Sequence, residues 1–232
     1  MAAKSDPSKP KAKAKAAKKA PAGRGAKAKA AKKAAGKPPA DLMVDAAFAL
    51  ADERPWREIS LREIAEASGL TFAEAYRHCP SKQSVLEAFL RRIDAAVLAE
   101  GPVSDAEGSA RDRLFDVLMR RFDALQPYRK ALASILLDQP RDPVSALAGL
   151  AGLQRSMAWM LETAGLDAGG LRGQVRIQGL TLIYLATLRT WLRDDSLDLA
   201  KTMAALDGYL RRVEGALRRL PRRSKGPAEA EE

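Results

Sequence analysis

The sequence predicts an all-α fold preceded by a disordered tail rich in Lys and Ala. From residue 41 onward, apolar residues recur at the spacing of one helix face. Several of these segments open with serine or threonine followed three residues later by glutamate, a pattern that caps helix N-termini. Glycine or proline follows their ends, and strand-like alternation of apolar and polar residues is absent.

The first two predicted helices are short. One covers residues 41–51 and is apolar along one face. Ser60 and Glu63 form a capping box that opens the next helix. Gly69 ends that helix, because glycine adopts the left-handed conformation of a helix C-terminus without strain.

A third helix follows after only two residues. Thr71 and Glu74 form its capping box, Pro80 ends it, and Ser81 caps a fourth helix. Two short helices joined by a Gly-containing turn are typical of a helix-turn-helix. The second helix of such a pair can place its N-terminal residues against base edges in the DNA major groove.

The rest of the chain also predicts helices. Gly101-Pro102 breaks the chain, and a capping box from Ser104 to Glu107 opens the next segment. Later helices are expected at residues 144–164 and 171–193. The last helix repeats apolar residues at spacings of four and three, a pattern that favours packing against a partner helix. Its apolar positions are Leu199, Met203, Leu206, Leu210, Val213, Leu217 and Leu220.

The positive charge is concentrated in the N-terminal tail. Residues 1–40 hold 13 Lys or Arg and one acid, a net charge of +12, whereas the remaining residues hold 27 basic and 28 acidic side chains, a net of −1. The tail lacks the apolar side chains that would offset the entropy of ordering it. Its composition favours salt-sensitive, sequence-independent binding to phosphates, and a solubilising extension is the alternative.

Other classes of function find little support in the sequence. Cys79 is the one cysteine and His78 the one histidine, so neither a disulfide nor a metal site is expected. No serine-histidine-aspartate triad, glycine-rich phosphate loop or carboxylate pair is recognisable, so we expect no enzyme, no catalytic residue and no cofactor. No segment has the roughly 18 apolar residues of a membrane span, which predicts a cytoplasmic protein without stable membrane insertion.

Residues 42–93 resemble the tetracycline-repressor (TetR) family of bacterial transcription regulators. The resemblance rests on Ile64-Ala65, Ala67-Ser68-Gly69-Leu70-Thr71, Tyr76-Arg77-His78, Ser81-Lys82 and Leu86. It implies a helix-turn-helix domain over residues 41–100 and a helical ligand-binding and dimerisation domain over residues 101–220. A disordered C-terminal tail, residues 221–232, follows.

The resemblance implies that double-stranded DNA is the partner. Thr71, Tyr76 and Lys82 would contact phosphates, and Arg77 could reach a guanine edge. The complete set of expected DNA-binding residues is Ser60, Thr71, Phe72, Ala73, Tyr76, Arg77, His78 and Lys82.

Three features depart from the family pattern. Cys79 stands where a phenylalanine is usual, and we interpret it as a small buried apolar residue rather than a redox sensor. Glu74 stands where a small or hydroxylated residue often faces DNA, and we expect it to cap its own helix. Residues 41–100 hold 7 basic and 11 acidic side chains, a net of −4, so the basic tail would have to supply attraction to DNA.

A second family of the same fold is the alternative. The stretch from Trp191 through Asp194-Asp195-Ser196 to Thr202 resembles a lipid-binding family that assists ubiquinone biosynthesis, in which the helix-turn-helix no longer binds DNA. The motif Tyr76-Arg77-His78 and the basic tail favour a transcription regulator over a lipid-binding protein.

If the chain is a transcription regulator, the resemblance implies that it is a homodimer. Members of the family are commonly repressors that a small effector releases from DNA. The expected interface residues are Met203, Leu206, Leu210, Val213 and Leu217, although the same stripe could pack within its own domain. The candidate pocket residues are Met157, Trp159, Met160, Tyr184 and Trp191, with ordinary core packing as the alternative. No cluster of buried charges is recognisable, so the expected effector is apolar.

Overall fold

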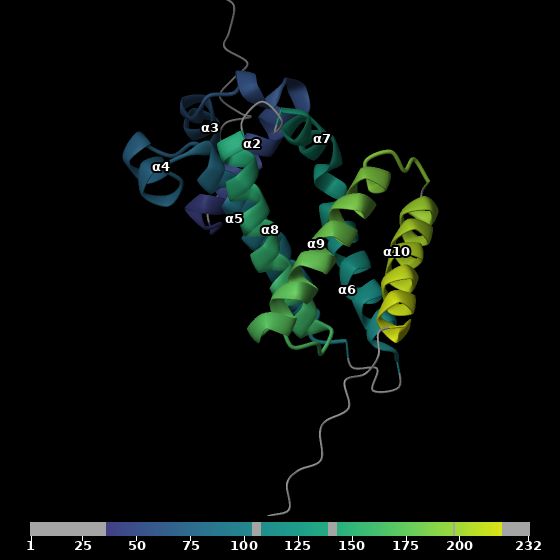
Figure 1. The fold of residues 1–232 in the computed structure, drawn as a ribbon. Coiled ribbons are helices and arrows are strands. Elements are labelled where there is room, and N and C mark those ends of the chain that lie inside the picture. The colour runs from purple at the N-terminus through teal and green to yellow at the C-terminus, as the bar shows by residue number, and fades with distance from the viewer. Residues whose placement is uncertain (1–35, 104–107, 139–142, 197, 220–232) are drawn as a thin grey trace, which may run out of the picture. The chain divides into compact units, whose positions relative to one another are not determined.

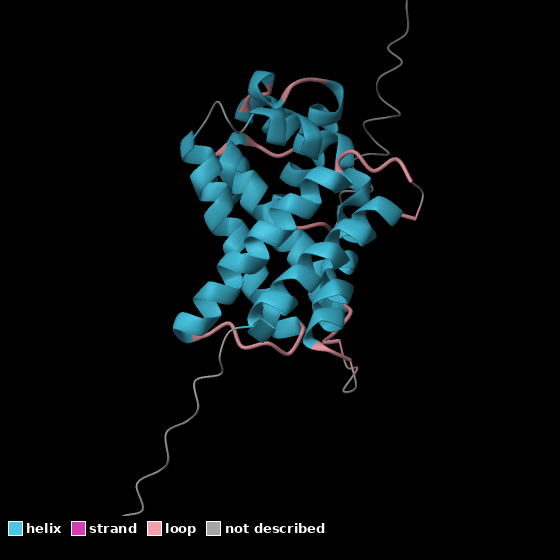
Figure 2. Cartoon of the chain, turned by 45° about the vertical axis from the view of Figure 1, so that its right-hand side comes forward, coloured by secondary structure: helices cyan, strands magenta, loops and turns pink. Residues whose placement is uncertain are grey.

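The computed structural model describes residues 36–103, 108–138, 143–196 and 198–219. Within these ranges it contains helices and loops and no strand (Figure 2), which confirms the all-α prediction. The described residues from Lys37 onward form one compact unit. Residues 1–35 and 220–232 lie outside the described ranges, so the expectations for the two tails stay predictions, as do the domain boundaries.

The N-terminal helices follow the predicted order (Figure 1). Helix α2 begins at Pro39, two residues before the predicted start, because proline is well accommodated in the first turn. The elements are α2 (Pro39–Glu53), the 3₁₀ turn η1 (Trp56–Glu58), α3 (Leu61–Ser68), α4 (Phe72–His78) and α5 (Lys82–Ala99).

The C-terminal helices are longer. They are α6 (Ala110–Leu125), the 3₁₀ turn η2 (Gln126–Tyr128), α7 (Arg129–Asp138), α8 (Pro143–Thr163), α9 (Gly170–Trp191) and α10 (Ala200–Arg219). The expected capping box at residues 104–107 lies outside the described ranges. Helix α6 is instead capped by Ser109, with Asp112 reaching back in place of glutamate.

Helix α5 joins the N-terminal helices to the C-terminal ones, since it packs against α2, α6 and α8. An aromatic cluster secures its N-terminal half. The ring centroids of Phe48 and Phe89 lie 4.1 Å apart, and Tyr128 meets both rings edge-on at 5.3 and 5.1 Å. Such aromatic contacts add to the stabilisation from apolar burial, and they tie α2, α5 and η2 together.

Helix α10 packs against α9 and α6. The loop before it is organised by the buried carboxylate of Asp194, which accepts hydrogen bonds from the backbone N–H of Thr202 at 2.8 Å and from its hydroxyl at 2.6 Å. Ser196 donates to the other carboxylate oxygen through its backbone N–H and its hydroxyl. Burial opposes ionisation of Asp194, but these hydrogen bonds outweigh it and hold its pKa well below the ordinary value.

Candidate nucleic-acid interface

Helices α3 and α4 form a helix-turn-helix whose local geometry follows from its caps. Ser60 and Thr71 each accept a hydrogen bond from the third backbone N–H of their helix, and Glu63 and Glu74 reach back, so both predicted capping boxes are confirmed. Gly69 ends α3 with φ of 75°, a conformation that strains other residues.

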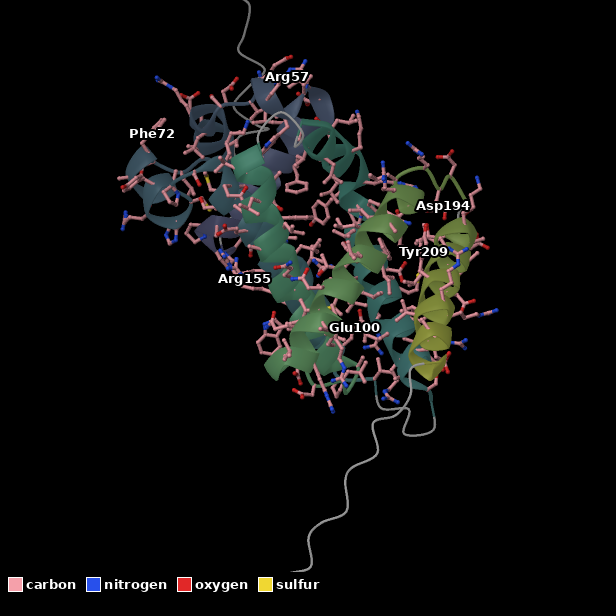
Figure 3. The ribbon with its side chains drawn as sticks, viewed as in Figure 1. Arg57, Phe72, Glu100, Arg155, Asp194 and Tyr209 are labelled. Atoms are coloured by element: carbon pink, nitrogen blue, oxygen red, sulfur yellow. The ribbon has the colours of Figure 1, made fainter. Side chains whose placement is uncertain are left out.

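Helix α4 buries one face and exposes the other. Ala75 and Cys79 are buried in the core. Phe72 is 56% exposed and Tyr76 71% exposed, although both are large aromatic residues. Phe72 points away from the core at the outer end of α4 (Figure 3). Side chains of this size usually gain free energy by burial, so an exposed aromatic pair on one short helix indicates a contact surface.

The remaining expected contact residues of α4 are also exposed. Ala73, Arg77 and His78 lie at the surface, and Arg77 Nε donates a hydrogen bond to the carbonyl of Ala73 at 3.2 Å. Thr71, at the N-cap, is exposed as well. The structure therefore brings six of the eight predicted contact residues together on α4 and its cap.

Glu74 is turned toward its own helix terminus. Its Oε2 accepts hydrogen bonds from the backbone N–H of Thr71 at 2.9 Å and from the Thr71 hydroxyl at 2.7 Å. These bonds lower the pKa of the Glu74 carboxyl. The acidic residue that departs from the family pattern thus stabilises the start of α4.

Lys82 is engaged inside the chain rather than held out toward a phosphate. Its Nζ donates hydrogen bonds to the carbonyls of Trp56 at 2.6 Å and Ile59 at 2.7 Å. The ammonium also lies 4.3 Å from the centroid of the Trp56 ring. Lys82 therefore fastens the start of α5 to η1, a role that its spacing in the sequence did not reveal. Ser60, also expected at the DNA, is exposed at the N-terminus of α3 and occupied as its cap.

Cys79 is fully buried at the C-terminus of α4. Burial raises the pKa of its thiol, which disfavours the reactive thiolate. This environment fits the interpretation of Cys79 as a small apolar core residue.

The comparisons with known proteins identify this domain. Residues 43–89 match the model of the family described as bacterial regulatory proteins, tetR family. Residues 43–89 form a tetR-family domain. A search of curated proteins gave no match.

Solved structures show the same fold over more of the chain. A TetR transcriptional regulator from Nitrosomonas europaea ATCC 19718 is 24% identical, with a TM-score of 0.63 over 77% of this chain and 99% of that one. A TetR transcriptional regulator from Rhodococcus sp. RHA1 is 17% identical, with a TM-score of 0.57 over 79% of this chain and 97% of that one. The tetR-family fold therefore extends beyond the matched domain into the C-terminal helices.

The predicted pocket residues separate into two groups. Met157, Met160, Tyr184 and Trp191 are buried, whereas Trp159 is 57% exposed. Trp159 therefore faces outward on α8 and lies apart from the other four.

The structure also contains a buried ion pair that the sequence analysis missed. Arg121 on α6 is fully buried and donates to Asp94 on α5. The sequence analysis recognised no cluster of buried charges, and this pair is one that it overlooked. A signal was present, because Arg121 lies on the same helix face as Leu118, Phe122 and Leu125.

The predicted dimer stripe on α10 is divided between core and surface. Leu206 and Leu210 are buried within this chain, which matches the alternative of packing on their own domain. Met203 is partly buried and Val213 exposed, while the side chain of Leu217 lies outside the described residues. Helix α9 exposes three apolar residues on one face, Leu171, Val175 and Leu182, with the exposed Gln178 between the last two.

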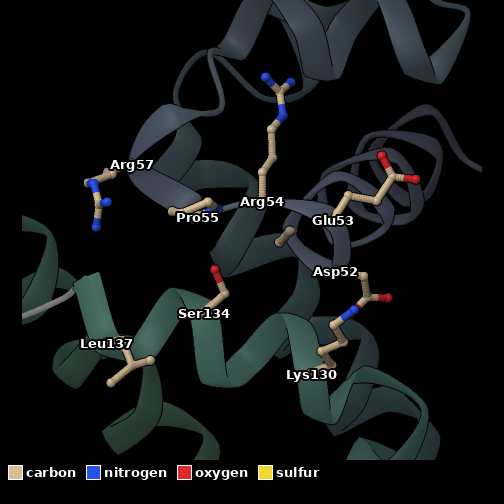
Figure 4. A pocket seen from close by; sticks show the side chains of 9 residues that line it. Asp52, Glu53, Arg54, Pro55, Arg57, Lys130, Ser134 and Leu137 are labelled. Atoms are coloured by element: carbon tan, nitrogen blue, oxygen red, sulfur yellow. The ribbon is translucent and has the colours of Figure 1, made fainter.

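A surface pocket of about 340 Å³ lies between the C-terminal end of α2 and α7 (Figure 4). Asp52, Arg54, Lys130 and Ser134 are among its lining residues. Next to it, the backbone N–H of Trp56 donates to the Ser134 hydroxyl at 3.1 Å. None of the predicted pocket residues lines this pocket.

The described helices include none that is long and apolar enough to cross a membrane.

Proposed function

We propose that the chain is a transcription regulator that binds an operator as a homodimer and acts as a repressor released by a small effector. The observation that carries this proposal is the exposed face of α4, where Phe72, Tyr76 and Arg77 stand free of the core at the tip of a tetR-family helix-turn-helix. A recognition helix needs such a face to reach base edges.

Base recognition is assigned to two side chains of α4. An arginine that reaches guanine O6 and N7 contributes about 1–3 kcal/mol of discrimination, and Arg77 is the exposed arginine of this helix. Phe72 is suited to apolar contact with a thymine methyl group. Tyr76 supplies an exposed hydroxyl group for a phosphate, and Thr71, whose hydroxyl already bonds to Glu74, can supply one only by giving up that bond.

The dimer interface is assigned to the exposed apolar residues of α9, and the exposed Val213 of α10 is the alternative centre. Leu171, Val175 and Leu182 are spaced so that they share one face, and all three are exposed in the single chain. Pairing this face with a second copy would remove an apolar surface from water. A two-fold dimer requires a roughly palindromic operator with half-sites one helical turn, or a multiple of it, apart.

The basic tail is assigned a sequence-independent role. Residues 1–40 carry a net charge of +12, while residues 41–100 carry a net of −4. The tail would attract DNA phosphates and release counterions, which makes binding steeply salt-dependent. Deleting residues 1–36 should weaken binding to all duplexes alike and flatten the dependence of affinity on salt. Unchanged affinity and salt dependence would contradict this role.

The test of the proposed function is selection of bound sequences from a pool of random duplexes by the full chain. Enrichment of a palindrome supports a sequence-specific regulator. No enrichment, together with a lipid that co-purifies with the protein, would contradict it and support the lipid-binding alternative.

A further inference from the structure

Arg121 on α6 lies against Asp94 of α5 and Tyr184 of α9. Its Nη1 donates a hydrogen bond to Asp94 Oδ1. The other carboxylate oxygen, Oδ2, accepts a hydrogen bond from the Ser156 hydroxyl of α8 at 2.7 Å. Both oxygens of Asp94 are therefore occupied, and Asp94 uses only one of the guanidinium nitrogens.

The opposite edge of the guanidinium has no such partner. Within the described part of the chain, Arg121 Nε and Nη2 are buried without a hydrogen bond of normal geometry, and the hydroxyl of Tyr184 lies close enough to interact with the guanidinium. These two nitrogens direct N–H groups side by side along one edge, the arrangement that binds the two oxygens of a carboxylate. Buried donors without acceptors cost free energy, so a ligand that supplies the acceptors gains affinity.

A row of aromatic rings begins at the guanidinium. The guanidinium carbon lies 5.4 Å from the centroid of the Tyr184 ring. Tyr184 stacks on Phe122 at 5.2 Å, and Phe122 lies 6.0 Å from Trp191. Trp191 Nε1 is another buried donor without an acceptor in the described residues. The surroundings therefore offer donors for an anion and apolar surface for the body that carries it.

We propose that Arg121 is the anchor of a binding site for a monocarboxylate with an apolar body. The carboxylate accepts hydrogen bonds from the paired N–H groups of Nε and Nη2. The apolar body of the ligand displaces the aromatic side chains between α6 and α9. A strongly hydrated dianion such as phosphate fits less well, because its desolvation in apolar surroundings costs more.

A carboxylate bound at this site also affects helix α5. A carboxylate on Arg121 shares the guanidinium with Asp94, so it weakens the link between α6 and α5. Helix α5 carries Asp94 near its C-terminal end and Lys82, which fastens it to η1, at its first residue. The role of the carboxylate as the effector rests on the proposed function, whereas its binding to Arg121 does not.

The test uses the full chain without DNA. The probes are hexanoate, decanoate, phenylacetate and naphthylacetate, each beside the primary amide of the same skeleton, and inorganic phosphate. At least one acid should raise the melting temperature by about 3–5 °C at saturation and bind about tenfold more tightly than its amide. The Nε–H resonance of Arg121 should shift with the acid and not with the amide.

Two variants separate this site from general acid binding. Arg121→Lys keeps a charge for Asp94 but lacks the paired donors, so it should lose the preference for acid over amide. Arg113→Lys is the matched control on α6, because Arg113 already donates to the carbonyls of Ala164 at 2.8 Å and Gly108 at 2.6 Å. It should keep the preference.

Trp191→Phe covers the possibility that Arg121→Lys does not fold. It removes one buried donor and keeps an aromatic ring, so it should weaken acid binding about threefold to tenfold. The proposal is overturned if no acid binds, if acids and amides bind alike, or if phosphate binds as tightly as the best acid. Operator binding in the selection experiment is independent of all these outcomes.

Discussion

The ammonium of Lys82 lies over the indole ring of Trp56 and donates a hydrogen bond to the Trp56 carbonyl at 2.6 Å. This contact joins the first residue of α5 to the turn that precedes α3. Because of this contact, Lys82 holds the helix-turn-helix in place and is not positioned to neutralise a phosphate.

Replacing Lys82 with methionine should therefore lower stability more than it changes DNA electrostatics. We expect the free energy of unfolding to fall by about 2 kcal/mol, because two carbonyl contacts and a cation–π contact are lost. The slope of log affinity against log salt should stay the same. A slope reduced by about 0.9 with unchanged stability would instead mean that Lys82 contacts a phosphate.

Phe72 should recognise the methyl group of thymine. Replacing the contacted thymine of the operator with deoxyuridine removes that methyl group, and the affinity of the unaltered chain should fall about fourfold. Phe72→Ala should bind both duplexes equally, which competition binding can measure. Equal sensitivity of the two proteins to the methyl group would show that another residue contacts it.

Asp194 should make the C-terminal helices sensitive to acid. Its pKa is depressed in the folded chain, so its contribution is present above the ordinary aspartate pKa of about 4 and is lost as pH falls below it. Asp194→Asn should cost about 2 kcal/mol at neutral pH and flatten the acid side of the stability profile.

Asp195→Asn is the control for that measurement, since Asp195 is exposed beside Asp194. It should leave stability at neutral pH nearly unchanged. Denaturant unfolding of the three proteins across the acid range provides the comparison. An Asp194→Asn profile that parallels the unaltered chain would contradict the assignment.

Val175→Asp should convert the proposed dimer to a monomer, because the substitution places a charge among the exposed apolar residues of α9. Light scattering after gel filtration measures the change in mass. Gln174→Asp adds the same charge at a neighbouring exposed position and should leave the dimer intact. If Val213→Asp dissociates the dimer and Val175→Asp does not, the interface is centred on α10.

The sequence predicted the helix-turn-helix well because its signals are local. A capping box joins residues three positions apart, and the left-handed turn at Gly69 depends on one residue. The capping box and the turn both depend on neighbouring residues and do not require tertiary packing. The same reasoning missed the cap of α6, because Ser109 is paired with Asp112 and not with the glutamate that the motif led us to expect.

The contacts that the sequence did not reveal join residues far apart in the chain. Lys82 meets Trp56 across 26 residues, and Ser156 meets Asp94 across 62. The spacing of apolar residues cannot show whether a charged side chain on a helix face finds a buried partner. For the same reason, the sequence could not show which apolar residues of α10 are buried and which are exposed. That depends on how α10 packs against α6 and α9.

The most direct test of the account is to repeat the random-duplex selection with Arg77→Ala and Phe72→Ala beside the unaltered chain. If α4 reads the bases, each variant should retain the palindromic arrangement of half-sites but lose its preference at one position in each half. Identical selected sequences from all three proteins, or no selected sequence from the unaltered chain, would contradict the assignment of α4 as the recognition helix.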